Sequence, residues 1–264
     1  MDLDQFKLHA ELEDHHWWFR ARRQILRELI HHTLPVGGSV IDIGCGTGGN
    51  INTLANDYPC LGLDSSAAAI DLARARFPRA EFICASIPVE LPSTLDRPRL
   101  FLLADVLEHV PDDAHFLRDL TSMLAPGDYL LLTVPADMSL WSSHDLSYGH
   151  YLRYDISRLE RAWEGLPLES LMLSYFNARL QPLVKAARAF SRRRRQAWGK
   201  AGTDLRLPHP WLNRILERIF AGEAAMLVEM LEGRCTQGYA AGVSLIALLR
   251  RKAEVPPVLL AAQR

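Results

Sequence analysis

The first periodic pattern along the chain lies at residues 17–32, where apolar residues recur at the spacing of one helical face. They are Trp18, Ile25, Leu26, Leu29 and Ile30. Pro35 and the pair Gly37 and Gly38 end this pattern, and the apolar run SVIDIG follows directly. The pattern therefore predicts an amphipathic helix followed by a short buried strand.

The same alternation of strand and helix continues as far as residue 135. Apolar runs predict further strands, and intervening segments have helical spacing. The expected strands are residues 60–64, 81–86, 99–105 and 128–135, and the expected helices are residues 48–56, 66–76 and the segment after Pro111. This spacing of βαβ units is typical of a parallel sheet with right-handed crossovers and helices on both faces.

Beyond Pro135 the pattern changes. Residues 141–154 (WSSHDLSYGHYLRY) lack clean periodicity and predict a structured loop. Two more strands are expected at residues 168–175 and 242–251, and two helices at residues 179–197 and 211–232. We therefore predict an α/β fold with a Rossmann-like, seven-stranded, mostly parallel sheet, helices on both of its faces and a helical C-terminal insertion.

This pattern also predicts how the chain is divided. We expect an N-terminal helical lid, a ligand-binding core, a helical insertion that covers the substrate, and a last strand with a tail. Their expected bounds are residues 1–36, 37–176, 177–240 and 241–264.

Composition narrows the function classes. The 264 residues are 48% apolar and 23% charged, which is ordinary for a globular enzyme, and a net charge of −1 gives no reason to expect nucleic acid as a partner. The four cysteines form no CxxC pair, so we expect neither a disulfide framework nor a zinc site. The acidic first residues exclude a signal peptide, and no apolar run approaches the ~20 residues of a membrane span. The expected location is therefore the cytoplasm.

A glycine-rich turn, DIGCGTGG at residues 42–49, follows the first strand. Its glycines fit the G-x-G-x-x-G fingerprint of dinucleotide folds, but a carboxylate at Asp42 would repel the pyrophosphate of a dinucleotide. The same carboxylate suits a cationic ligand such as S-adenosylmethionine. Asp64 follows 22 positions later at the end of the second strand, where it is placed to accept hydrogen bonds from a ribose. An NAD-dependent oxidoreductase is therefore disfavoured.

Residues 38–135 resemble the core of class I S-adenosylmethionine-dependent methyltransferases. The resemblance lies in IDIGCGTGGN, LGLDSS, FICASIPVELP, ADVLEHVPDD and LAPGDYLLLTVPA. The chain is also similar to a narrower bacterial subgroup that has an N-terminal HWWFRARR (here residues 16–23) and a later W-S-x-H-D…G-H-x-R-R-Y (here residues 141–154). Leu152 stands where that subgroup has the first of its two arginines.

The resemblance implies that S-adenosylmethionine is the cofactor. It places the methionine part of the cofactor at Gly44 and Gly46, the ribose at Asp64 and the adenine beside Ser86. The expected cofactor contacts are Asp42, Gly44, Cys45, Gly46, Asp64, Ser65, Ala85, Ser86, Ala104, Asp105, Trp18 and Arg23. For two of these residues a structural role is equally open: Trp18 is either a lid or a core aromatic, and Arg23 either pairs with the cofactor carboxylate or is solvated.

A cluster of polar residues after the fifth strand is our candidate for substrate chemistry. Methyl transfer to a hydroxyl requires alignment and removal of a proton, and a His–Asp pair with a pKa near neutral would supply a base. The candidate catalytic residues are His144, Asp145, His150 and His109, and the candidate substrate contacts are Trp141, Arg153, Tyr154 and Glu223. The alternatives are a hydrogen-bonded network that fixes the loop, an ion pair for Glu223, and a metal site, for which the irregular spacing is a weak signal; no metal is expected.

The predicted function is methyl transfer from S-adenosylmethionine to a small-molecule or lipid-linked acceptor, with oxygen as the expected acceptor atom and carbon or nitrogen as the alternatives. Arg188 and Arg192–Arg195 form a basic amphipathic stretch that predicts peripheral membrane contact, with a solvated face as the alternative. Two other functions stay open at this point: a scaffold subunit that binds the cofactor without turnover, and a transferase that uses a modified sulfonium cofactor.

Overall fold

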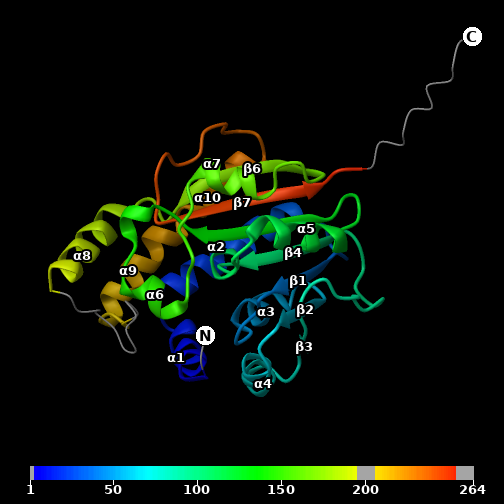
Figure 1. Ribbon diagram of the computed structural model, residues 1–264, viewed down its shortest axis with the longest axis horizontal. Helices are drawn as coiled ribbons and strands as arrows, with labels where there is room; N and C mark the ends of the chain where they lie inside the picture. Colours follow the sequence, from blue (N-terminus) through cyan, green and yellow to red (C-terminus); the bar gives the residue numbers. More distant parts are fainter. Residues whose placement is uncertain (1–2, 195–205, 254–264) are drawn as a thin grey trace, which may run out of the picture.

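The computed structural model describes residues 3–194 and 206–253. Its centre is one seven-stranded sheet in the order β3-β2-β1-β4-β5-β7-β6, in which only the pairs made by β7 are antiparallel (Figure 1). The strands are β1 (Ser39–Ile43), β2 (Cys60–Asp64), β3 (Glu81–Cys84), β4 (Arg99–Ala104), β5 (Tyr129–Pro135), β6 (Leu168–Phe176) and β7 (Ser244–Arg251). The predicted fold class is confirmed.

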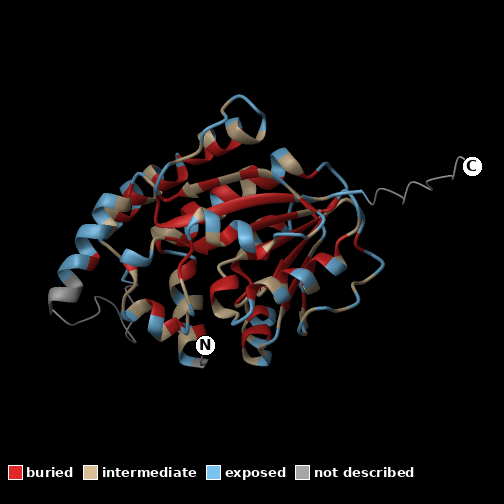
Figure 2. Cartoon of the chain, turned by 45° about the horizontal axis from the view of Figure 1, so that its top comes forward, coloured by how far each residue is buried: buried red, intermediate tan, exposed pale blue. Residues whose placement is uncertain are grey.

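Helices cover both faces of this sheet, which explains why its strands are continuous apolar runs. Successive residues of β4 point to opposite faces: Leu100 and Leu102 belong to one buried cluster, and Phe101 and Leu103 belong to the other. The first cluster also includes apolar residues of α2 (Trp17–Thr33), α9 (Pro210–Ala221) and α10 (Ala224–Leu231). The second cluster includes apolar residues of α5 (Asp113–Met123) and α7 (Ile156–Ala162). Figure 2 shows the strands as the most deeply buried part of the chain.

The strand order reverses beside β1, and this reversal creates the place where ligands bind in open α/β sheets. β1 pairs with β2 on one side and β4 on the other, so the loops after these three strands diverge around one crevice. The backbone N–H groups of Gly44 and Cys45 donate to the carbonyl of Leu63, at 2.7 and 2.9 Å, and so tie the glycine turn to the end of β2.

The remaining helices differ in part from prediction. The N-terminal helix α1 (Leu3–Glu13) was not predicted, the loop at residues 141–154 contains α6 (Ser143–Tyr148), and α3 (Gly49–Leu54) and α4 (Ala67–Arg76) follow the prediction closely. The predicted helix at 179–197 is observed as α8 (Gln181–Arg194), and residues 195–197 lie outside the described residues. No helix of the described part is long and apolar enough to cross a membrane.

The single helix predicted at residues 211–232 is wrong, because α9 ends at Ala221 and α10 begins at Ala224. Glu223, at the junction, is fully buried, and its carboxylate accepts a hydrogen bond of 2.8 Å from the backbone N–H of Arg179. The buried carboxylate therefore fixes the loop after β6.

Candidate active site

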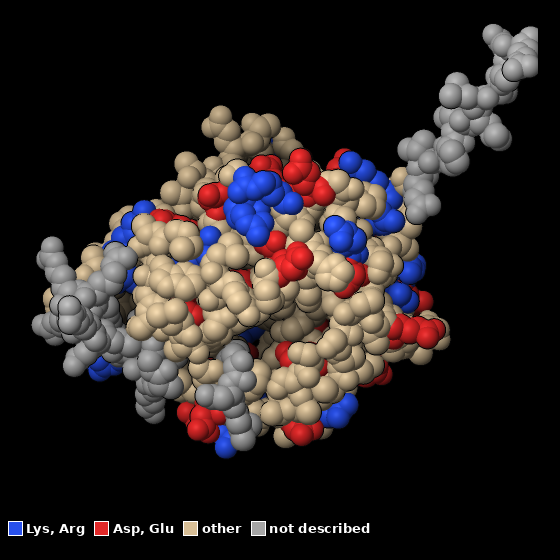
Figure 3. Space-filling model, in the orientation of Figure 1, with Lys and Arg blue, Asp and Glu red and all other residues tan. Residues whose placement is uncertain are grey.

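A cavity of about 890 Å³ lies at the carboxyl ends of the parallel strands. One part is lined by the glycine turn and the ends of β2 and β3, and the other by the histidines after β4 and α6 together with α8. In the space-filling view a hollow opens in the middle of the molecule, between α1 and α6 on one side and α3 on the other (Figure 3). All the predicted cofactor contacts line this cavity except Asp42 and Arg23.

The glycine turn has the backbone that its sequence requires. Gly44 and Gly46 have φ values of +70° and +54°, which side chains rarely adopt, and a Cβ at Gly44 would lie 2.5 Å from Cγ2 of Val106. Asp64 supports the same turn: its carboxylate accepts hydrogen bonds from the backbone N–H of Gly46 at 2.9 Å and of Ser66 at 2.8 Å. Asp64 also lines the cavity, so its carboxylate has access to a ligand lying on the turn.

Asp42 acts from behind the turn rather than as a lining residue, which corrects the expected direct contact. Its side chain is fully buried, Nδ2 of Asn50 donates to one carboxylate oxygen at 3.3 Å, and Oδ1 has no partner among the described residues. Burial raises the pKa of Asp42 to about 7. A cation bound on the turn would stabilise this carboxylate, whereas a pyrophosphate would repel it. The residues present therefore fit the sulfonium and ammonium groups of S-adenosylmethionine.

The raised pKa of Asp42 predicts a pH dependence. Because the folded-state pKa is about 7 and the usual value is 3.8, the folded chain keeps a proton that the unfolded chain releases between these values. The contribution of Asp42 to the free energy of unfolding therefore falls by about 1.4 kcal/mol per pH unit as pH rises through this window, and is constant above it. The free energy of unfolding, measured by urea denaturation at pH 5 and pH 7.5, is expected to fall more in the native chain than in the Asp42→Asn variant.

Cofactor affinity is expected to rise with pH, whereas the contribution of Asp42 to the free energy of unfolding falls. Since a cation favours the ionised carboxylate, the affinity for S-adenosylmethionine rises by up to about tenfold from pH 6 to pH 8. Calorimetric titration of the Asp42→Asn variant serves as the control and is expected to be flat over the same range. An equal rise in both proteins would show that Asp42 does not sense the cofactor.

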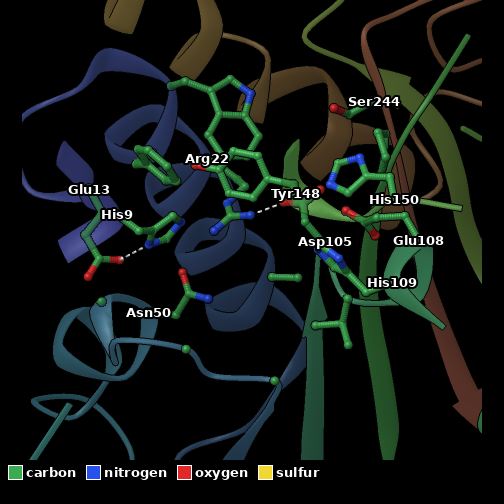
Figure 4. Close-up of a pocket in the computed structure, with 18 of the residues that line it drawn as sticks. His9, Glu13, Arg22, Asn50, Asp105, Glu108, His109, Tyr148, His150 and Ser244 are labelled. Atoms are coloured by element: carbon green, nitrogen blue, oxygen red, sulfur yellow. Dashed lines mark hydrogen bonds and ion pairs between the residues drawn. The ribbon is translucent and has the colours of Figure 1, made fainter. Parts of the chain in front are cut away.

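The second helix brings an aromatic and a cationic side chain into the cavity. Arg22 forms an ion pair with Asp105 (Figure 4). Its guanidinium lies 4.7 Å from the ring centroid of Trp18. Arg22 lines the cavity, whereas Arg23 does not: Nη2 of Arg23 donates to the backbone carbonyl of Glu13 at 2.5 Å. Arg23, which was expected to pair with the cofactor carboxylate, therefore lies outside the cavity, and its neighbour Arg22 lines it.

Helix α1 is fastened over the cofactor end of the cavity by a buried carboxylate. Glu13, only 4% exposed, accepts a hydrogen bond of 2.7 Å from Thr47 and forms an ion pair with Arg76 of α4. Arg76 also donates to the carboxylate of Asp14 at 2.8 Å. Residues from α1, the glycine turn and α4 therefore meet in one polar cluster that closes the cavity on this side.

Replacing Arg76 by methionine is expected to loosen α1, because it leaves the buried Glu13 carboxylate with only the weaker, more distant pairs to Arg23 at 4.0 Å and His9 at 3.7 Å. We expect amide hydrogen exchange in residues 3–13 to accelerate at least tenfold, and the dissociation of S-adenosylmethionine to accelerate with it. The exposed Arg79→Met variant is the matched control and is expected to match the native chain. Unchanged exchange in α1 would contradict a fastening role for Arg76.

Three histidines gather at the other end of the cavity, beside α8. The ring centroids of His109 and His150 are 4.7 Å apart, and those of His144 and His150 are 6.3 Å apart. Burial lowers the pKa of His109 to about 4 and that of His144 to about 3, so both rings are neutral near pH 7. The base was expected at His144 or His150, and the lowered pKa of His144 differs from the near-neutral value expected of such a base. The observed His–Asp pair is His150 with Asp145, at 3.2 Å between Nδ1 and Oδ1.

Asp145 is the centre of a buried ionic network rather than a cavity residue. Its carboxylate is fully buried and accepts hydrogen bonds from Nε of Arg153 at 2.8 Å and Nη1 of Arg188 at 3.2 Å. These cations and the His150 hydrogen bond hold the pKa of Asp145 well below its usual range, against the effect of burial. Arg188, only 9% exposed, faces inward, so its predicted membrane contact is wrong. The side chains of Arg192–Arg195 lie outside the described part of the chain.

Three predicted substrate contacts are corrected by their positions. Trp141, Tyr154 and Glu223 do not line the cavity, whereas Arg153 does. The hydroxyl of Tyr154 donates to the carboxylate of Asp113 at 3.0 Å and the ring is buried, so Tyr154 fixes the loop to α5. The sequence prediction also missed residues that do line the cavity, among them Arg22, Glu108 and Tyr148.

Comparison with known proteins identifies the family. The sequence matches the methyltransferase domain family over residues 16–199. The trans-aconitate 2-methyltransferase of Variovorax paradoxus (strain S110) is 35% identical over 105 residues, which cover 39% of this chain and 40% of that protein. The enzyme of the same name from Rhodopseudomonas palustris (strain BisB5) is 28% identical over 200 residues, or 74% of this chain and 67% of that protein. The chain thus spans about two fifths of the length of the first curated relatives it matches.

Solved structures agree with this fold. The methyltransferase in complex with the Haloferax volcanii Trm112 activator has a TM-score of 0.57 at 17% identity, and the match covers 96% of this chain and 95% of that one. The plantazolicin methyltransferase BpumL, solved with S-adenosylhomocysteine, has a TM-score of 0.50 at 16% identity and covers 88% of this chain and 83% of that one. At this identity these neighbours show the fold alone. The chain therefore belongs to the methyltransferase domain family, which agrees with the predicted enzyme class.

Proposed function

We propose that this protein transfers a methyl group from S-adenosylmethionine to an oxygen atom of a small-molecule or lipid-linked acceptor. The observation that carries the proposal is that one cavity joins the glycine turn and Asp64 to the histidine cluster of His109, His144 and His150. A cofactor on the turn would thus share its cavity with an acceptor among the histidines. A scaffold without turnover would not need this open path.

The acceptor end combines an apolar wall with a few polar groups. Leu183, Val184 and Ala187 of α8 line it together with the neutral rings of His109 and His144. Such a lining favours an acceptor with an apolar body and a hydroxyl or carboxylate at its reacting end. In this proposal residues 1–36 close over the cofactor end and residues 177–240 cover the acceptor end.

The chemistry divides between the cofactor and the chain. When bound, S-adenosylmethionine supplies an electrophilic methyl carbon on a sulfonium. Asp64 binds the ribose, Asp42 complements the positive charge from behind the turn, and the Arg22–Asp105 pair borders the space between the two ends. The histidines orient the acceptor oxygen, so alignment of the two reactants is the main contribution of the chain.

The first test is calorimetric titration of the full chain with S-adenosylmethionine and, separately, with NADH. We expect micromolar binding of the sulfonium cofactor only. Radiolabelled methyl transfer is then measured with a panel of carboxylic acids including trans-aconitate, of phenols, and of phenols on polyprenyl chains. Labelled methyl esters or ethers support the proposal and separate the small-molecule from the lipid-linked class. A folded chain that fails to bind S-adenosylmethionine, or that binds it without transfer to any acceptor class, would overturn it.

A further inference from the structure

We propose that Glu108, His109 and His150 bind a divalent transition-metal ion at the acceptor end of the cavity, and that this ion holds and activates the acceptor oxygen. The second part of the proposal rests on the proposed methyl transfer, whereas the metal site stands on its own geometry.

The three side chains converge from two separate segments. Glu108 and His109 lie in the short helix η1 (Leu107–His109) after β4, and His150 follows α6. One carboxylate oxygen and one nitrogen of each ring all lie within 4.8 Å of one another, and all three residues line the cavity. Figure 4 shows them as neighbours at one side of the pocket. A small contraction would bring these atoms to a common ion, since ligands on opposite sides of a metal are about 4 Å apart.

Glu108 gives an independent reason to expect a cation. Its side chain is 1% exposed, and Oε2 has no hydrogen-bond partner among the described residues. An unpaired buried carboxylate is costly, and metal coordination is one of the few ways to relieve that cost. The neighbouring arginines do not serve this purpose, because Arg22 is paired with Asp105 and Arg153 with Asp145.

The two histidines are already oriented as metal ligands usually are. Metal-binding imidazoles almost always use their other nitrogen to donate to a carboxylate or a backbone carbonyl. Nδ1 of His150 lies 3.2 Å from Oδ1 of Asp145, which leaves Nε2 for a ligand, and the ring of His109 hydrogen-bonds the backbone of Tyr148. Asp145 is held in turn by Arg153. Both rings therefore have the outer partners that a metal site requires.

The donor set indicates the kind of ion. Two imidazoles and one carboxylate suit Zn²⁺, Mn²⁺ or Fe²⁺, whereas Mg²⁺ and Ca²⁺ prefer sites made of oxygen atoms. Three protein ligands leave coordination positions open toward the cavity, where an acceptor hydroxyl can bind. A bound ion lowers the pKa of that hydroxyl. Its proton passes to water, the oxygen takes the methyl carbon, and the carbon–sulfur bond breaks with its electrons left on sulfur, so no oxidant or reductant is required.

The binding test uses the full chain after chelator treatment, titrated by calorimetry with Zn²⁺, Mn²⁺ and Mg²⁺ separately, and with Mn²⁺ by electron paramagnetic resonance. We expect one Zn²⁺ or Mn²⁺ per chain and much weaker binding of Mg²⁺. Glu108→Gln and His150→Gln are each expected to weaken this binding at least 100-fold. His115→Ala removes an exposed histidine outside the cavity and is expected to bind as the native chain does. Thermal unfolding of each variant in chelator shows that it is folded.

The outcomes separate this inference from the proposed function. Binding of no ion by the native chain, or equal binding by the native chain and both glutamine variants, would overturn the metal site. If an ion binds but chelator leaves the methyl-transfer rate unchanged, the activating role is overturned while methyl transfer stands. Metal binding without methyl transfer to any acceptor leaves the site in place and overturns the proposed function.

Discussion

Replacing Asp145 by alanine is expected to lower the free energy of unfolding by about 3–5 kcal/mol, because it leaves buried charges without their counter-ion. The carboxylate is fully buried, and its partners Arg153 and Arg188 are 5% and 9% exposed. It also accepts the backbone N–H of Ser142 at 2.9 Å as part of the capping box that begins α6. One substitution therefore removes an anion, a helix cap and the partner of His150.

Urea denaturation measures this loss, and the surface pair of Glu169 with Arg250 is its control. Both members of that pair are 45% exposed and lie 2.6 Å apart, so Glu169→Ala is expected to cost less than about 1 kcal/mol. Asp145→Asn keeps the shape of the side chain and loses its charge. Its loss in free energy of unfolding is expected to lie between those of Asp145→Ala and Glu169→Ala. A loss for Asp145→Ala no greater than that for Glu169→Ala would mean that the buried network does not hold the loop in place.

Most of the fold could be predicted because its signals are local. Mostly apolar strands of four to nine residues, bounded by turn residues, alternate with segments of helical spacing, and β2 is observed with the predicted bounds of 60–64. The glycine turn follows a predicted strand, and Asp64, Ser86 and Asp105 each end one; a parallel sheet necessarily brings such positions to one edge. The cofactor end of the cavity was therefore accessible from spacing alone.

The remaining features of the candidate site depend on contacts between positions that are distant in sequence, which periodicity does not reveal. Arg188 reads as part of a basic helical face, yet it pairs with Asp145, 43 positions earlier in the chain. Likewise, Arg22 and Arg23 are equivalent in sequence, and only the packing of α1 separates them. Glu108 was missed although it directly precedes His109, because a glutamate in a short turn usually faces solvent. Its location at the end of β4, among the ligand-binding loops, was the signal that would have found it.

The largest effect on cofactor binding is expected from Asp64→Ala. The carboxylate lines the cavity and also accepts the backbone N–H groups of Gly46 and Ser66, so it both contacts a ribose and holds the turn on which the cofactor lies. Hydrogen bonds to a charged group contribute about 1.5–3 kcal/mol each. Loss of two hydrogen bonds to the ribose is therefore expected to weaken S-adenosylmethionine binding by about 100-fold or more, as measured by calorimetric titration.

A second substitution separates these two roles of Asp64. The Asp64→Asn variant keeps an acceptor for only one of the two backbone N–H groups and loses the charge, so its thermal stability measures the damage to the turn. A ribose contact predicts a loss of affinity, about tenfold or more, that exceeds this loss of stability, whereas a role limited to the turn predicts that affinity falls only as far as stability does. Asp71→Ala, which replaces an exposed aspartate on α4, controls for the loss of one negative charge and is expected to bind normally. Because thermal stability follows the turn whereas affinity also follows the ribose contact, the two measurements together decide which role carries the affinity.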